Sequence, residues 1–390
     1  MLVPLITLPY LIKVLGRETY GLIIYAQAIV SYFQILIDFG FNLSSTKNIS
    51  IYRTDKKKIS EIVSSTLILK GILFIVSFLV LILVSHLFPK VSEHKTLFYL
   101  MMYLGFYEWI FPVWYFQGFE KMKYITLINL MSRTIFLSLV FFLVKNEGDY
   151  LKVPMINGLG ALMAGGFALF TVFRKDGINF IFPRRTVLNY YLKDSLPIFF
   201  SSIAGKIKIL TNKAVLGSYI GMESVALYDI ADKIMAVFSS FLHIIGQVLF
   251  PNVSQTKNKN LTKRGVRIIL SVGFSLYVLS AVILAVLIPR FFPAYTEVVN
   301  VFWILGLLIF IQPTSYLIGT GVLLVNDLKR QYTINLYITM IVYLVLIGIC
   351  FKLNIINIYF TAISLVLSLI VELGGRLIIC KRNRLLDWVI

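Results

Sequence analysis

The chain has 390 residues, of which 58% are hydrophobic and 14% are charged, and its mean hydropathy is +0.86. This composition excludes a soluble globular protein and predicts an integral membrane protein. The formal net charge of +19 would suit a nucleic-acid partner, but the placement of the basic residues argues against one.

Lysine and arginine gather in alternate loops between the apolar runs. The basic loops are Lys47 to Lys58, Lys121 and Lys123, Arg174 to Lys193, Lys257 to Arg267, Lys329 and Arg330, and Lys381 to Arg384. If the helices pass up and down in turn, these loops share one side, which the positive-inside rule assigns to the cytoplasm. The sequence therefore predicts a multi-pass protein with a cytoplasmic C-terminus and no nucleic-acid partner.

About eleven apolar runs are long enough to cross a hydrocarbon core of about 30 Å, and one more is short. In the first half, the runs are residues 2–14, 22–41, 62–88, 96–119, 125–144 and 153–173. In the second half, they are residues 197–219, 225–250, 266–288, 298–325, 331–351 and 355–379. The first run gives a helix of only about 18 Å, so either this helix enters the bilayer incompletely or the chain lacks an upstream part, and we expect the second, a truncated first helix. The prediction is an all-α fold with about twelve transmembrane helices.

A basic, aromatic and partly amphipathic segment, residues 174–194, separates the two halves. Such a segment is expected to lie along the cytoplasmic interface. We therefore predict an N-terminal lobe at residues 1–173, an interfacial linker at 174–194 and a C-terminal lobe at 195–390. The letters VLG, then a turn and a Tyr-bearing helix, occur at residues 14–16 and again at 215–217, and paired halves are typical of transporters.

The segment PLITLPYLIKVLGRETYGLIIYAQAIVSYFQILIDFGFNLSSTK, residues 4–47, carries a specific resemblance. A Pro-containing first helix that ends LPYL and VLG, a YG turn, and a second helix that ends in D-FG-N-S are similar to the opening of the polysaccharide flippases. These are the O-antigen and teichoic-acid type transporters of the MATE-like MOP superfamily. The resemblance implies two pseudo-repeated six-helix lobes around a central cavity, in the bacterial cytoplasmic (inner) membrane.

The resemblance also implies the cargo and the partners. Similar flippases move an oligosaccharide linked to undecaprenyl pyrophosphate, such as an O-antigen unit for lipopolysaccharide biosynthesis, from the cytoplasmic to the outer leaflet. The lobes would rock by alternating access, and the polymerase and chain-length proteins of the same pathway are expected partners beside the lipid bilayer.

Ionisable side chains inside the predicted helices are the candidate site, because charge at that depth costs at least a few kcal/mol. Lys206 and Lys213 share a helix face and Lys208 points about 160° away, so Lys208 must pair, snorkel or lie near a helix end. Lys206, Lys213 and Arg133 have no carboxylate within one turn. We predict a cationic cavity for an anionic cargo, formed by Arg133, Lys206 and Lys213, with Lys208 and Lys233 as further members.

The buried acidic residues allow two interpretations. Asp229 with Lys233, and Glu372 with Arg376, have the i and i+4 spacing of local ion pairs. A buried carboxylate can instead bind a proton, so ion-coupling candidates for an H⁺ or Na⁺ gradient are Asp38, Glu108, Asp229 and Asp232. For Asp38 and Glu108, the alternative is a salt bridge to one of the predicted cavity cations. We expect no cofactor and no metal site.

Two other functions remain open at this stage. A multidrug or metabolite exporter of the same fold would favour an acidic cavity, since its cargo is often cationic. A membrane glycan polymerase would need a large external loop, and the external loops predicted here are short. Neither a Ser-His-Asp order nor an HExxH or Walker motif occurs, so the sequence predicts a transporter rather than an enzyme.

Overall fold

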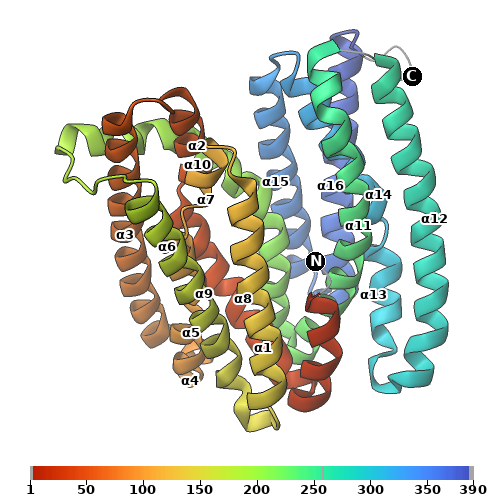
Figure 1. Ribbon diagram of the computed structural model, residues 1–390. Coiled ribbons are helices and arrows are strands. Elements are labelled where there is room, and N and C mark those ends of the chain that lie inside the picture. The colour runs from red at the N-terminus through yellow and green to blue at the C-terminus, as the bar shows by residue number, and fades with distance from the viewer. Residues whose placement is uncertain (1–2, 257–258, 386–390) are drawn as a thin grey trace. The chain divides into compact units, whose positions relative to one another are not determined.

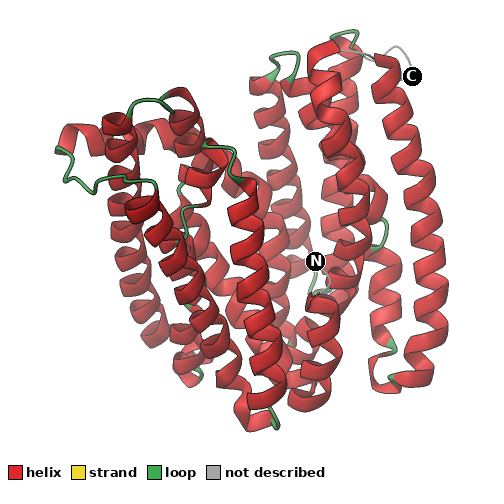
Figure 2. Ribbon diagram, in the orientation of Figure 1, coloured by secondary structure: helices red, strands yellow, loops and turns green. Residues whose placement is uncertain are grey.

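The computed structural model describes residues 3–256 and 259–385, and within them all regular secondary structure is helical (Figure 2). The predicted all-α fold is therefore confirmed. Lys257, at the start of one predicted basic loop, lies outside the described residues.

The chain divides into two compact units, one of residues 9–206 and one of residues 207–390 together with residues 1–8 (Figure 1). The elements of the first unit are most of α1 (Val3–Asp38), α2 (Phe41–Ile51), α3 (Lys56–Leu87), α4 (Pro89–Glu93), α5 (Lys95–Met101), α6 (Tyr103–Ile110), α7 (Val113–Gly118), α8 (Met122–Leu143), η1 (Glu147–Leu151), α9 (Lys152–Phe170), η2 (Thr171–Lys175) and the greater part of α10 (Arg185–Val215). The predicted linker, residues 174–194, runs from the end of η2 into the first turns of α10, and its role as a lobe boundary stays a prediction.

The second unit holds the end of α10 and the later helices. Its elements are η3 (Leu216–Ile220), α11 (Met222–Thr256), α12 (Lys259–Phe291), η4 (Pro293–Tyr295), α13 (Glu297–Leu305), α14 (Leu308–Ile318), η5 (Gly319–Leu324), α15 (Lys329–Lys352) and α16 (Ile358–Arg382). Among the described residues, 8 helical segments are long and apolar enough to cross a membrane. The predicted number of about twelve transmembrane helices stays a prediction, because α10 and α11 carry several charges and residues 95–118 are interrupted.

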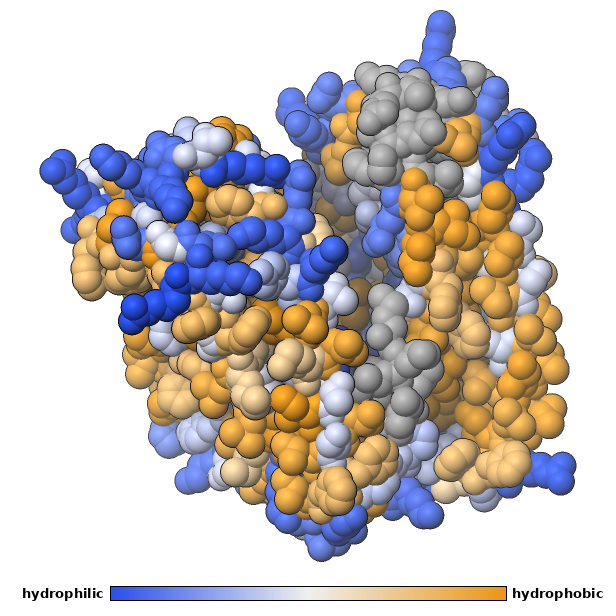
Figure 3. Space-filling view, viewed as in Figure 1, coloured by the Kyte–Doolittle hydropathy of each residue, from blue (hydrophilic) through white to orange (hydrophobic). Residues whose placement is uncertain are grey.

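The surface of the helices is apolar where a soluble protein would be polar. Ile72, Ile75, Leu79 and Leu83 repeat at helical spacing along one face of α3, and each is half exposed or more. A stripe of this kind normally faces a core, so its exposure marks a lipid-facing surface. Figure 3 shows the resulting apolar band across the helices of residues 9–206, with hydrophilic residues at both ends of the band.

Each unit has its own buried core. In residues 9–206, α2 packs against α3 and α7, and this contact buries Phe41, Trp114 and Phe116 completely. In the second unit, α11 packs against α12, α13 and α14, while α16 packs against α13, α14 and α15. These bundles bring together charged residues that lie far apart in the sequence.

A glycine interrupts the first helix. Gly16 has φ 74° and ψ 173°, a conformation that side chains with a Cβ rarely adopt. The turn predicted after the letters VLG is thus confined to Gly16, and the prediction of a YG turn is wrong, because residues 17–21 are helical. Polar side chains at a membrane surface can reach water without leaving a helix, so their polarity did not require a turn.

A second break separates α1 from α2 and positions the candidate site. Phe39 has φ 45° and Gly40 has φ 78°. A Cβ atom on Gly40 would lie 2.9 Å from the Ile198 Cβ and from the Phe199 backbone nitrogen, so glycine lets α10 approach closely. Asp38 ends α1 at this break, and its carboxylate accepts the backbone N–H of Asn42 at 3.1 Å in the first turn of α2.

Candidate functional site

A buried lysine that the sequence analysis did not select lies beside the break between α1 and α2. Lys70 of α3 is fully buried, and its Nζ lies 2.7 Å from the Glu108 Oε1 and 3.7 Å from the Asp38 Oδ1. Asn42 accepts from Lys70 at 3.1 Å and donates to Glu108 at 2.8 Å, and Gln34 donates to the other Glu108 oxygen at 3.4 Å. This Lys70 cluster sets one ammonium against two carboxylates.

For Asp38 and Glu108, the alternative to ion coupling is a salt bridge to one of the predicted cavity cations. A salt bridge forms, but to Lys70 rather than to Arg133 or Lys206. Lys70 stands in the apolar run 62–88, so the rule that selected the other intramembrane charges would also have found it.

A second cluster lies where α10, α14, α15 and α16 meet. Glu372 accepts from the Lys208 Nζ at 2.6 Å, from the Arg376 Nη2 at 2.8 Å and from the Ser315 hydroxyl at 3.3 Å. Lys208 also donates to the Thr339 hydroxyl at 3.3 Å. This Glu372 cluster sets two buried cations against one carboxylate. The predicted i, i+4 pair of Glu372 with Arg376 is confirmed, and of the three options for Lys208, the structure has the ion pair.

Arg376 is fixed further by its neighbours. It donates to the Ser315 carbonyl and stacks on the Tyr332 ring, with its guanidinium carbon 4.9 Å from the ring centroid. A Cβ atom on Gly319, the first residue of η5, would lie 2.6 Å from an Arg376 nitrogen. A π-helical turn that begins with glycine therefore makes room for the guanidinium.

A third cluster joins the end of α10 to the start of α11. The Lys213 Nζ lies 2.7 Å from the Asp229 Oδ1 and 2.8 Å from the Asp232 Oδ2, and Lys233 lies 2.7 Å from the other Asp229 oxygen. The predicted pair of Asp229 with Lys233 is confirmed. The expectation that Lys213 has no carboxylate partner is wrong, because α11 folds back beside α10 and supplies two. This Lys213 cluster is neutral.

Two of the predicted cations differ from the rest. Arg133, in the middle of α8, and Lys206, in α10, are both exposed. Within the described part of the chain, the side chain of neither residue makes an ion pair or a hydrogen bond. They are thus available to an anion, whereas Lys208, Lys213 and Lys233 are engaged by carboxylates of their own unit.

The described residues contain no group of three or more histidine, cysteine or acidic side chains that could hold a metal ion. The carboxylates of the three clusters can exchange protons, and the two exposed cations can bind an anion.

Comparison with known proteins gives consistent matches. A family model described as polysaccharide biosynthesis protein matches residues 1–257. A candidate O-antigen transporter of Escherichia coli strain K12 is 28% identical over 340 residues, which cover 85% of this chain and 82% of that protein. A candidate O-antigen transporter of Shigella dysenteriae is 30% identical over 257 residues, which cover 65% of this chain and 64% of that protein.

Solved structures share the fold at low sequence identity. The lipid II flippase MurJ, in an inward closed conformation, has a TM-score of 0.74 at 16% identity. The match covers 95% of this chain and 83% of the MurJ chain. A multidrug resistance MATE family transporter of the MOP superfamily, in an outward-facing conformation, has a TM-score of 0.60 at 13% identity and covers 95% of both chains.

Proposed function

We propose, since this chain belongs to the polysaccharide biosynthesis protein family, that it moves a lipid-linked oligosaccharide across the bacterial cytoplasmic membrane. The resemblance to polysaccharide flippases in residues 4–47 is confirmed by the family match. The chain is a transporter rather than an enzyme, because its relatives are named as transporters and its fold neighbours as flippases and transporters.

The observation that carries the choice of cargo is the pair of exposed cations, Arg133 and Lys206. A pyrophosphate linkage is strongly anionic, and a lysine or arginine without a carboxylate partner can form charge-assisted hydrogen bonds with it. We propose undecaprenyl pyrophosphate as the lipid carrier and these two side chains as contacts for its headgroup. Binding roles for Lys208, Lys213 and Lys233 stay predictions, and their carboxylate partners would have to release them first.

We further propose alternating access from the cytoplasmic to the outer leaflet. Its support is that similar folds occur in an inward closed and in an outward-facing conformation. The basic loops and the C-terminus are assigned to the cytoplasm by the same positive-inside argument as before. A polymerase or chain-length protein would receive the product on the outer side.

The Lys70 cluster is our proposed site of ion coupling. Its two carboxylates face a single ammonium. If one carboxylate binds a proton, the other stays ionised and balances the charge of Lys70. We propose H⁺ rather than Na⁺, because the Lys70 ammonium already occupies the position that a metal ion would need. Reconstituted transport should follow an imposed pH gradient and ignore an imposed Na⁺ gradient; the reverse result would overturn this assignment.

Export of cationic drugs is the second candidate, favoured by the likeness to the multidrug transporter. The sign of the free charges separates the two. Exposed cations repel a cationic drug and attract a pyrophosphate.

Complementation tests the proposed cargo. An Escherichia coli strain that lacks its candidate O-antigen transporter is scored for surface glycan and for accumulated lipid-linked precursor. The wild-type chain should restore the glycan and clear the precursor. Lys206→Ala and Arg133→Ala should each lower export by about tenfold, since a hydrogen bond to a charged group contributes about 1.5–3 kcal/mol.

Matched controls come from the same helices. Lys193→Ala in α10 and Lys123→Ala in α8 remove exposed cations near the basic loops and should leave export unchanged. Normal export by both Lys206→Ala and Arg133→Ala, at normal protein level in the membrane, would contradict the proposed contacts. Export of a cationic dye by the wild-type chain without any glycan rescue would favour the drug exporter.

A further inference from the structure

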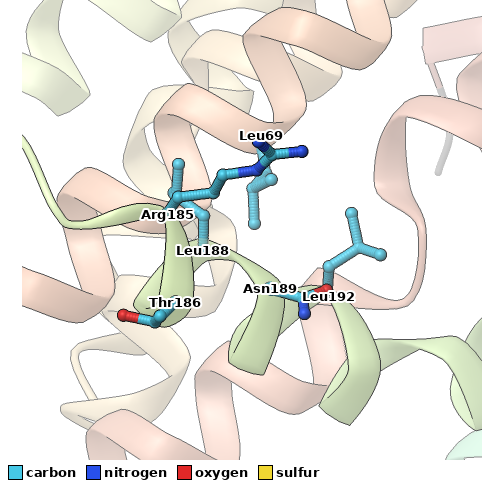
Figure 4. A pocket seen from close by; sticks show the side chains of 6 residues that line it. All are labelled: Leu69, Arg185, Thr186, Leu188, Asn189 and Leu192. Carbon is cyan, nitrogen blue, oxygen red and sulfur yellow. The ribbon is translucent and has the colours of Figure 1, made fainter.

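A pocket of about 440 Å³ opens on the surface of the unit of residues 9–206, between α3 and the first turns of α10 (Figure 4). Its apolar lining consists of leucines, and polar side chains complete it. The lining residues are Leu69, Arg185, Thr186, Leu188, Asn189 and Leu192. The pocket therefore combines an apolar interior with a charged group, as an amphiphilic ligand requires.

Hydrogen bonds join the two sides of the pocket. The backbone N–H groups of Asn179 and Ile181 donate to the hydroxyls of Ser60 and Ser64 on α3, at 3.2 and 2.9 Å. The Tyr191 hydroxyl donates to a carboxylate oxygen of Glu61 on α3, at 3.1 Å. The chain that leads into α10 and the first turns of α10 are thus held against α3.

The polar side chains of the pocket have no partner in the described part of the chain. Within the described residues, the side chains of Arg185, Thr186 and Asn189 make no hydrogen bond or ion pair, and all three residues are exposed. Two acidic side chains of the elements that line the pocket, one on α3 and one on α10, already have partners. Glu61 pairs with a lysine one turn before it, and Asp194 accepts from an asparagine of α2 at 3.1 Å. The pocket therefore offers an uncompensated positive charge.

Its surroundings place it at the membrane surface. Phe180, Phe182 and Tyr190 are exposed on the same segment, and Phe182 is 88% exposed. Aromatic side chains of this kind gather at the level of the lipid headgroups. Arg184 and Lys193 add two more exposed cations beside them.

We propose that this pocket binds an anionic phospholipid from the leaflet on the basic side of the protein. Arg185 would form a bidentate contact with the phosphate, and Thr186 and Asn189 would donate to its remaining oxygens. The glycerol and the upper part of an acyl chain would cover Leu69, Leu188 and Leu192. Basic pockets between transmembrane helices on the cytoplasmic side suit such headgroups. The occupant is a resident lipid, distinct from the transported cargo.

Native mass spectrometry of the full chain in detergent tests the proposal by counting bound lipids. The probes are phosphatidylglycerol and phosphatidylcholine with the same acyl chains. The wild-type chain should bind phosphatidylglycerol in preference. Arg185→Ala should weaken that binding by about fivefold, since one basic side chain near a lipid surface contributes about 1 kcal/mol. Leu188→Trp should weaken it as well, because it fills the pocket and leaves the charge unchanged.

Two controls make the result specific. Lys123→Ala removes an exposed cation from α8, a helix that does not line the pocket, and should bind phosphatidylglycerol as the wild type does. Undecaprenyl phosphate should not displace phosphatidylglycerol. Equal binding of both phospholipids, equal loss in Arg185→Ala and Lys123→Ala, or displacement by undecaprenyl phosphate would each overturn the proposal. No transport is measured, so the outcome is independent of the proposed function.

Discussion

The Glu372 cluster permits a sharp test of how buried charge holds the second unit together. Lys208 and Arg376 are 1% and 3% exposed, and both depend on the single carboxylate of Glu372. Glu372→Gln would leave two buried cations without a counter-charge. Lys208→Met would instead leave the neutral pair of Arg376 and Glu372. The substitution that removes the carboxylate should therefore be far more harmful than the one that removes a cation.

The expected magnitudes follow from the geometry. Removal of one partner from a buried ion pair costs about 3–5 kcal/mol, whereas replacement of charge by a packed apolar side chain is often close to neutral. We expect Glu372→Gln to be less stable than Lys208→Met by at least about 2 kcal/mol. Thermal unfolding of the purified protein in detergent measures the order of Tm, with the exposed Glu297→Gln as a control. A Tm of Lys208→Met at or below that of Glu372→Gln would refute the reasoning.

Three further outcomes can be measured on the unit of residues 9–206. Lys70→Met should destabilise by about 3–5 kcal/mol in thermal unfolding, because two carboxylates lose their ammonium, and the double variant with Asp38→Asn should recover part of the loss. Gly40→Ala should cost about 2–4 kcal/mol, from the left-handed backbone and the contact with α10 together; an unchanged Tm would contradict both causes. The hydrogen bond from Arg53 holds the pKa of Glu120 below its ordinary value of 4.5, so this pair should persist above pH 4.5 and be lost as the pH falls below it. Carboxyl NMR titration should show the pKa of Glu120 return toward 4.5 in Arg53→Gln, and no change would exclude the contact in solution.

Local patterns in the sequence were enough to predict the helices and the short-range ion pairs. Apolar runs locate the helices because lipid demands them, and the i, i+4 spacing alone places Glu372 beside Arg376. The pair of Lys208 with Glu372 could not be predicted in this way, since 164 residues separate the partners and only the packing of α10 against α16 brings them together. The carboxylate partners of Lys213 follow it in the sequence by 16 residues or more, and they contact it only because α11 folds back beside α10.

The two free cations and the Lys70 cluster belong to one unit, and this suggests how cargo and proton could be coupled. We propose that Lys206 interacts electrostatically with Asp38, because it lies about two turns along α10 from Phe199, whose ring stacks on that of Phe39 at 4.5 Å. An ionised Asp38 competes with an anion for Lys206, and a protonated Asp38 does not. The backbone N–H of Asn42 and the Lys70 ammonium hold the Asp38 carboxylate in place. Because such coupling is reciprocal, Asp38→Asn should raise the affinity for an anionic lipid headgroup and remove the pH dependence of that affinity.

Binding of undecaprenyl pyrophosphate to the reconstituted protein, measured at several pH values, tests this coupling. The wild-type affinity should rise as the pH falls, because protonation releases Lys206, and Asp38→Asn should show the high affinity at every pH. Lys206→Ala should abolish the pH dependence and lower the affinity at the same time, which a purely structural role of Asp38 would not produce. A pH dependence that persists in Lys206→Ala would show that the proton acts on the cargo through another group.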